Sequence, residues 1–128
     1  MKQEINYTIK GEVVSGKKLG RRLGFPTANI MAGETPGVRD GVYAAQAEID
    51  GQTYHGMANL GRKPSFPEDY AGRLLEVNFF GFSGDLYGRE LEVSLLKYIR
   101  PEQEFETAAE LQRMVAEDKH EIERFFKH

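Results

Sequence analysis

Two oxygen-bearing side chains at the end of a glycine-rich segment are the residues best placed to do chemistry. The segment reads Gly20-Arg21-Arg22-Leu23-Gly24-Phe25-Pro26-Thr27-Ala28-Asn29. Pro26 fixes its own φ and favours an extended conformation of the residue before it. If the chain stays extended, Thr27 and Asn29 point to the same side and present a hydroxyl and an amide carbonyl together. Mg²⁺ accepts such hard oxygen donors, so the pattern predicts a magnesium site at Thr27 and Asn29.

A basic cluster lies just before these donors. It consists of Lys17, Lys18, Arg21 and Arg22, four cations in six residues. Glycine lets backbone N–H groups approach a ligand, here near Gly16 and Gly20, and such groups combined with cations suit a polyphosphate. The sequence contains neither G-x-x-x-x-G-K-[ST] nor G-x-G-x-x-G, which excludes a P-loop and a Rossmann turn. Two plainer alternatives stay open: the cluster is a solvated turn, and Thr27 and Asn29 only satisfy local backbone groups.

The alternation of side chains singles out Glu76 among the acidic residues. It falls in the run 74–80, which reads as a strand. One face of this strand carries Leu75, Val77 and Phe79, and the other carries Leu74, Glu76, Asn78 and Phe80. A carboxylate among apolar neighbours is either an edge residue in water or a placed general base.

Several blocks of the sequence, taken in order, resemble the riboflavin kinase (flavokinase) family. The blocks are Gly16, Gly20-Arg21, Leu23-Gly24-Phe25-Pro26-Thr27-Ala28-Asn29, Gly41-Val42-Tyr43-Ala44, Asn59-Leu60-Gly61 with Pro64-Ser65-Phe66, Glu76, Leu86-Tyr87-Gly88, Ile99-Arg100-Pro101 and a C-terminal helix with Asp118. They cover nearly the whole chain. The resemblance implies Mg²⁺-dependent transfer of the γ-phosphate of ATP to the 5′-hydroxyl of riboflavin, which gives FMN and ADP.

The resemblance also implies roles for individual residues. Glu76 corresponds to the family's catalytic base, and Thr27 and Asn29 correspond to residues that face the magnesium and the ATP phosphates. Tyr87, Arg100 and Asp118 are expected on the flavin side. The residues expected to bind nucleotide or flavin are Gly16, Lys17, Gly20, Arg21, Pro26, Thr27, Asn29, Tyr87, Arg100 and Asp118.

The sequence departs from the family pattern at three positions. Asn78 stands where the family usually has a histidine, and Gly81 stands where it has an acid. Ser65 replaces a threonine and keeps the hydroxyl. None of the three is the expected base or a magnesium ligand, and the first two are changes that could lower activity.

Composition limits the class of protein. With 128 residues, 40% of them hydrophobic, the chain is expected to form one domain over residues 1–128. The net charge of −3 does not favour nonspecific binding to nucleic acid. Cysteine is absent, which excludes disulfides and thiol catalysis. There is no apolar leader at the start and no membrane-length run, so we expect a cytoplasmic monomer without a membrane or nucleic-acid partner.

Short strands and one helix must position these residues. Strands are expected over 5–14, from about Pro26, and over 41–49, 52–60, 74–80 and 90–98, with loops at 31–39 and 61–72 and a hairpin turn at Asp50-Gly51. Thr107 and Glu110 form a capping-box pattern before a helical stripe over 108–126. About six short strands with hairpin turns and one terminal helix favour a mainly β fold, a closed antiparallel barrel with the helix packed outside it. The resemblance implies the same architecture, a six-stranded antiparallel Greek-key barrel with a C-terminal helix. The alternative is a β-sandwich.

These observations favour a riboflavin kinase. Two other classes stay open: a noncatalytic flavin- or nucleotide-binding module on the same barrel, and a small barrel that binds RNA through the basic cluster. The acidic net charge and the lack of alternating exposed aromatic and basic residues count against RNA.

Overall fold

The structure is a computed structural model that describes residues 4–14, 27–62 and 72–127. Its elements are β1 (Glu4–Val14), β2 (Ala28–Gly33), β3 (Gly41–Ile49), β4 (Gln52–Gly61), β5 (Arg73–Phe79), β6 (Glu90–Arg100) and α1 (Ala108–Phe126). The expected elements are present. The loop expected from Met31 begins later, because Met31 pairs with Leu74 and Gly33 pairs with Arg73, which extends β2.

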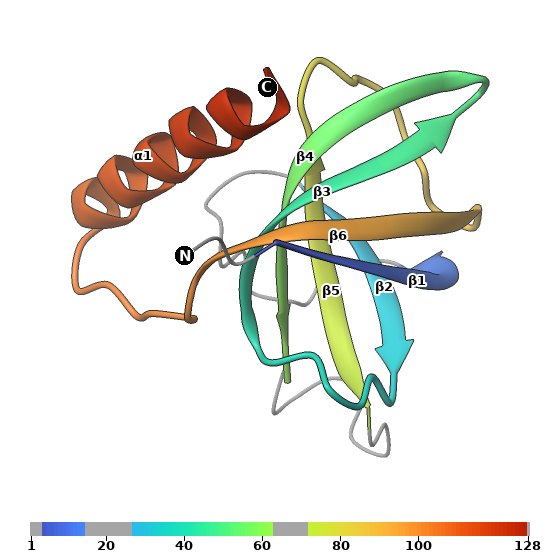
Figure 1. The fold of residues 1–128 in the computed structure, drawn as a ribbon, viewed down its shortest axis with the longest axis horizontal. Coiled ribbons are helices and arrows are strands. Elements are labelled where there is room, and N and C mark those ends of the chain that lie inside the picture. Colours follow the sequence, from blue (N-terminus) through green and yellow to red (C-terminus); the bar gives the residue numbers. More distant parts are fainter. Residues whose placement is uncertain (1–3, 15–26, 63–71, 128) are drawn as a thin grey trace.

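The six strands close into an antiparallel barrel in the order β1-β2-β5-β4-β3-β6 (Figure 1). Strands β3, β4 and β5 are neighbours in sequence and in space, and β6 returns to lie beside β3. The spatial order β6-β3-β4-β5 is that of a Greek key. The structure therefore confirms the expected Greek-key barrel rather than a sandwich.

A tight turn joins β3 to β4. Asp50 and Gly51 have φ angles of 54° and 81°. Two successive residues with positive φ are typical of a type I′ turn, which matches the twist of the two strands that it joins. The prediction of a hairpin at this dipeptide is confirmed.

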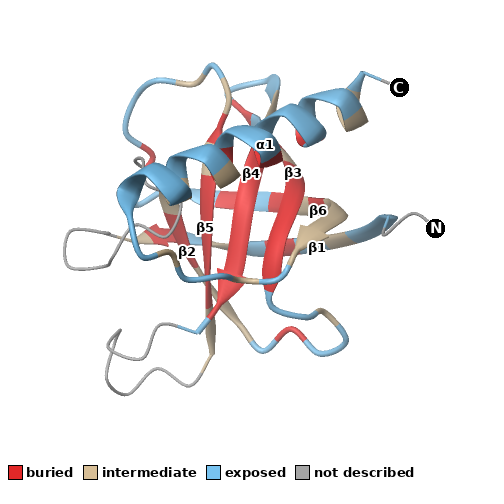
Figure 2. Ribbon diagram, turned by 90° about the vertical axis from the view of Figure 1, so that its left-hand side faces the viewer, coloured by how far each residue is buried: buried red, intermediate tan, exposed pale blue. Residues whose placement is uncertain are grey.

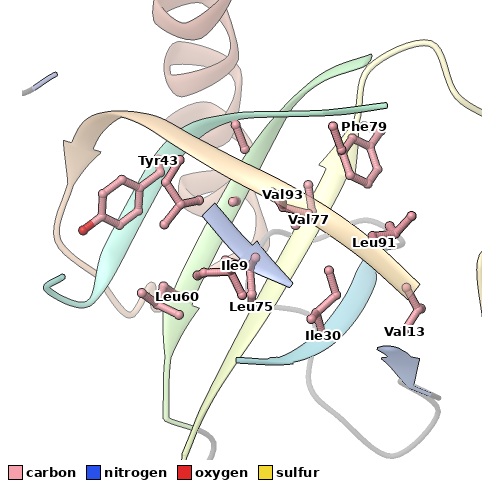
Figure 3. Close-up of a cluster of buried hydrophobic side chains, with 14 of the residues drawn as sticks. Ile9, Val13, Ile30, Tyr43, Leu60, Leu75, Val77, Phe79, Leu91 and Val93 are labelled. Carbon is pink, nitrogen blue, oxygen red and sulfur yellow. The ribbon is translucent and has the colours of Figure 1, made fainter. Parts of the chain in front are cut away.

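Side chains from all six strands fill the inside of the barrel (Figure 3). Every second residue of β5 contributes, with Leu75, Val77 and Phe79 all buried in this core. Ile30 of β2 and Leu60 of β4 are fully buried there as well. Because neighbouring strand residues alternate in direction, the residues between these core positions face the outside of the barrel.

Helix α1 covers part of this outer face (Figure 2). Its Val115 and Ile122 pack with Val42 and Ala44 of β3 and with Met57 of β4. Near the end of the helix, the ring of Phe126 stacks on His55 of β4, with 3.7 Å between centroids. The helix thus buries its apolar stripe against the barrel, as the sequence pattern predicts.

The start of α1 carries half of the expected capping box. The side chain of Thr107 accepts a hydrogen bond from the Glu110 N–H at 3.1 Å. The Glu110 carboxylate accepts from the Glu106 N–H at 3.2 Å, one residue before the position that a full capping box uses. Within the described ranges, no helix is both long and apolar enough to cross a lipid bilayer.

Candidate functional site

Three buried polar side chains lie beside one another on the outer face of the barrel. Asn29 of β2 pairs with Glu76 of β5, and Glu76 pairs with Asn59 of β4. Residues directly opposite one another on antiparallel strands point to the same face, with Cβ atoms about 4.5–5.5 Å apart. We call Asn29, Glu76 and Asn59 the polar row.

The polar row is outside the barrel but shielded from water. Ile30, Leu75 and Leu60, the chain neighbours of its three members, point into the core. The row side chains therefore point outward. Their exposed fractions are nevertheless only 6% for Asn29, 1% for Glu76 and 4% for Asn59. The alternation predicted for residues 74–80 is confirmed, and Glu76 is not an edge residue in water.

Thr27 extends the polar row at the β2 end. Its Oγ1 donates a hydrogen bond to Asn29 Oδ1 at 3.5 Å, and Asn29 Nδ2 donates to the Thr27 carbonyl at 3.3 Å. The two oxygen atoms thus lie side by side, as the extended-chain argument predicts. The second hydrogen bond also satisfies a local backbone group, which was the plainer alternative for this pair.

The donor set at Thr27 and Asn29 fits a magnesium ion. Octahedral Mg²⁺ with ligands at about 2.0–2.1 Å places neighbouring oxygens about 2.9 Å apart. The observed separation of 3.5 Å is within reach of a small side-chain rotation. No group of three or more His, Cys, Asp or Glu that could hold a metal occurs among the described residues. A cation at this pair would therefore draw further oxygens from a phosphate ligand and from water.

At the other end of the polar row, Asn59 is bonded to Glu102. Its Nδ2 donates to Glu102 Oε2 at 2.7 Å. The carboxylate of Glu102 lies against Gly61, where an added Cβ would overlap it. Sequence reasoning missed both Asn59 and Glu102 as site residues. The available signal was that Asn59 is a polar residue alternating with the apolar Ala58 and Leu60.

Two of the three residues expected on the flavin side, Arg100 and Asp118, lie together where β6 meets α1. Arg100 Nε donates to Asp118 Oδ2 at 2.8 Å, which ties the end of β6 to α1. The Arg100 guanidinium also lies 5.8 Å from the ring centroid of Phe105. Burial raises the pKa of the Asp118 carboxyl, and the hydrogen bond from Arg100 opposes this shift. Since Val42 pairs with both Asn59 and Arg100, one strand separates this group from the polar row.

Tyr87 lies apart from these groups. It is 63% exposed and sits in the connection between β5 and β6. This connection is fixed to β1, because the Gly88 N–H donates to the Val13 carbonyl at 2.9 Å and the Val13 N–H donates to the Arg89 carbonyl at 2.8 Å. The other expected binding residues, Gly16, Lys17, Gly20, Arg21 and Pro26, lie outside the described residues.

Two of the three departures from the family pattern fall on the described chain. Asn78 is on the outer face of β5, two residues after Glu76, and pairs with Met57. Gly81 has a φ of 79°, a conformation that glycine adopts without strain and that costs a residue with a Cβ atom about 1–2 kcal/mol. The turn after β5 therefore favours a glycine at this position. Ser65 lies outside the described residues.

A family model and several characterised proteins match the sequence of this chain. A family model described as "Flavokinase: Riboflavin kinase" matches residues 3–126. The bifunctional riboflavin kinase/FMN adenylyltransferase of Bacillus subtilis (strain 168) is 41% identical over 122 residues, covering 94% of this chain and 39% of that protein. The RNA-binding riboflavin kinase RibR of the same organism is 41% identical over 110 residues, covering 86% of this chain and 47% of that protein. The chain belongs to the riboflavin kinase family.

Solved structures give the same fold. A crystal structure titled macrolide-efflux protein, from Streptococcus pneumoniae, superposes with a TM-score of 0.71 at 33% identity, covering 90% of this chain and 36% of the other. Riboflavin kinase from Trypanosoma brucei superposes with a TM-score of 0.63 at 22% identity, covering 95% and 80% of the two chains. At 22% identity, the likeness to the Trypanosoma brucei structure shows the fold alone. The chain spans about two fifths of the length of its bifunctional relatives, 39% for the Bacillus enzyme.

Proposed function

We propose that this chain is an ATP:riboflavin 5′-phosphotransferase that uses Mg²⁺ and forms FMN and ADP. The observation that carries the proposal is the polar row, in which Glu76 lies between an oxygen-donor pair and a hydrogen-bonding amide. Membership of the riboflavin kinase family supports the same reaction class. Residues 1–128 would then form one kinase domain, with riboflavin and ATP as its small-molecule partners.

In this proposal Glu76 is the general base. Its carboxylate accepts the proton of the riboflavin 5′-hydroxyl while that oxygen forms a bond to the γ-phosphorus of ATP. The bond from the γ-phosphorus to the bridging oxygen breaks at the same time, and its electron pair leaves with ADP. A positioned base contributes about 10²–10⁴-fold to the rate. Positioning of the two substrates contributes more, since phosphoryl transfer asks little covalent work of the protein.

Thr27 Oγ1 and Asn29 Oδ1 would hold Mg²⁺ together with phosphate oxygens. The metal supplies neutralisation of the charge on the phosphate chain. Lys17, Arg21 and the backbone near Gly16 and Gly20 are proposed to hold the same phosphates, with Pro26 keeping the approach extended. Arg100, Asp118 and Tyr87 are proposed on the riboflavin side, where Phe105 adds an apolar ring beside Arg100.

The first test is FMN formation with Mg²⁺, ATP and riboflavin, with riboflavin and FMN separated by chromatography. We expect product only when all three are present. Glu76→Gln keeps the shape of the side chain and is expected to lower turnover by about 10²–10⁴-fold while riboflavin binding is retained. Glu48→Gln, at an exposed position of β3, is the matched control and should behave as the unaltered chain.

Two outcomes would contradict this proposal. Undiminished turnover in Glu76→Gln would remove Glu76 from the role of base. Failure of the unaltered chain to form FMN while it still binds riboflavin would favour a noncatalytic flavin-binding module instead. The RNA binding named for one relative is not carried over, because this chain covers only 47% of that protein.

A further inference from the structure

The order of groups along the polar row indicates which side of the proposed site binds ATP and which side binds the acceptor. The oxygen-donor pair at Thr27 and Asn29 lies on the β2 side of Glu76, and Asn59 lies on the β4 side. Phosphoryl transfer needs the attacking and leaving oxygens roughly in line across the transferred group. With the ATP phosphates on the β2 side, the acceptor molecule must extend from Glu76 towards β4. This step rests on the proposed function.

The length of the acceptor chain matches the spacing of the strands. Riboflavin carries its reactive hydroxyl at the end of a five-carbon ribityl chain with three secondary hydroxyl groups. With C–C bonds of about 1.5 Å, an extended chain places C2′ about 4 Å from C5′. Neighbouring strands lie about 4.7–4.9 Å apart. With the 5′-oxygen at Glu76 on β5, the secondary hydroxyl groups reach the position of Asn59 on β4.

The groups at this position suit a polyol. The Asn59 amide has two N–H donors and a carbonyl acceptor, and the Glu102 carboxylate has two acceptor oxygens. The two side chains already lie together, with 2.7 Å between Asn59 Nδ2 and Glu102 Oε2. Glu102 stands in the connection after β6 and is only partly buried, whereas Asn59 is 4% exposed. Ligand hydroxyl groups can therefore displace or share the Glu102 carboxylate without disturbing β4.

We propose that Asn59 and Glu102 form a subsite that binds the secondary hydroxyl groups of the ribityl chain. The amide donates to one hydroxyl oxygen, and the carboxylate accepts from a neighbouring hydroxyl. A flavin that keeps the terminal hydroxyl but lacks the others would fill the same space and form no hydrogen bond with the pair. The subsite therefore selects a polyol-bearing flavin over its alkyl counterpart.

The test compares riboflavin with a flavin that bears a 5-hydroxypentyl chain. Binding is measured by quenching of flavin fluorescence, so that it does not depend on turnover. We expect Glu102→Gln to weaken riboflavin binding by about tenfold to a hundredfold, the range for hydrogen bonds to charged groups. Binding of the hydroxypentyl flavin should change by less than about twofold, since this ligand offers no secondary hydroxyl to bond. Glu104→Gln, an exposed glutamate of the same connection, is the matched control.

A second variant separates binding from folding. Gly61→Ala adds a methyl group where the Glu102 carboxylate lies and leaves every polar group in the sequence. It should displace Glu102 and reduce the preference for riboflavin as Glu102→Gln does, and thermal denaturation shows whether the barrel is intact. Equal weakening of both flavins in these variants would overturn the proposal, because it would make the pair a structural link.

The unaltered chain gives two further decisive outcomes. If it binds riboflavin and the hydroxypentyl flavin equally while still forming FMN, the subsite is wrong and the kinase proposal stands. If it binds neither flavin and forms no FMN, the proposed function fails and the subsite fails with it.

Discussion

At the scale of single residues, the groups around a buried carboxylate indicate which role it can have. Glu76 and Asp118 are both buried, at 1% and 4% exposure. Asp118 is held by a hydrogen bond from the Arg100 guanidinium. Glu76 instead lies between the asparagines of the two neighbouring strands. Asp118 therefore suits a structural or ligand-orienting role, and Glu76 suits proton transfer.

Removing either oxygen donor beside Glu76 should weaken the metal-dependent step. We expect Thr27→Ala and Asn29→Ala to raise the Mg²⁺ concentration needed for half-maximal FMN formation by about tenfold or more, since loss even of the groups that support a metal's ligands costs about 10–100-fold in affinity. The measurement is a Mg²⁺ titration at fixed ATP. Thr53→Ala, at an exposed threonine of β4, serves as the control. An unchanged requirement in both variants would exclude this pair as the metal site.

Some site residues could be predicted from the sequence and others could not. Thr27 and Asn29 are two residues apart, so an extended chain alone places them together. Asn59 and Glu102 are 43 residues apart and meet only because the connection that follows β6 brings Glu102 to β4. No local pattern encodes that contact. Gly61 leaves room for the Glu102 carboxylate, but the need for a glycine there can be recognised only in the structure.

At the scale of elements, the Arg100–Asp118 contact ties β6 to α1. Burial raises the pKa of the Asp118 carboxyl. A raised pKa in the folded state means that the native chain binds this proton more tightly than the unfolded chain. The contribution of Asp118 to stability is therefore fully present below its ordinary value of 3.8 and is lost as the pH rises through the folded-state pKa.

The pH dependence of the contribution of Asp118 to stability can be measured. Urea unfolding of the unaltered chain and of Asp118→Asn, at a series of pH values from about 4 upward, gives the difference in unfolding free energy. We expect the advantage of the unaltered chain to shrink as the pH rises. Glu123→Gln, at an exposed position of the same helix, should give a difference that is nearly independent of pH. An advantage that grows with pH would mean that Arg100 outweighs burial.

The packing of α1 against the barrel should depend most on the side chain of Ile122. Ile122 is fully buried between the helix and the outer face of β3 and β4. Ile122→Ala is expected to cost about 2–5 kcal/mol of unfolding free energy, the range for removing a buried isoleucine. Urea denaturation measures this directly. Glu123→Ala, one residue further and exposed, should stay within about 0.5 kcal/mol, and an equal effect of the two would mean that α1 is not held by this contact.

The elements themselves were predictable because their signals are local. The β-rich run 41–49 and its partner 52–60, with Asp50-Gly51 between them, predict a hairpin from local signals alone. The end of β2 was less predictable. Gly33 reads as the start of a loop, yet it pairs with Arg73 across a register shift. Pairing with a partner strand decided this boundary, and local preference did not.

At the scale of the whole molecule, the order of strands creates the site. Strand β2 lies between β1 and β5, so Asn29 meets Glu76 although the two are far apart in sequence. A closed barrel and a sandwich are both compatible with short strands and turns, and periodicity alone does not decide between them. The Greek-key order could be predicted only from resemblance to a family. The same resemblance indicated Glu76 and Asn29, whereas the placement of Asn29 and Asn59 on the two sides of Glu76 depends on the strand register.

The burial of Glu76 has a consequence for fidelity. A carboxylate that is 1% exposed cannot activate bulk water, because water does not reach it. For the proposed kinase, ATP bound beside Thr27 and Asn29 would stay intact until a riboflavin hydroxyl takes the place next to Glu76. Exclusion of water from an active site prevents hydrolysis of this kind. The packing that buries Glu76 would thus prevent the proposed kinase from hydrolysing ATP when no riboflavin is bound.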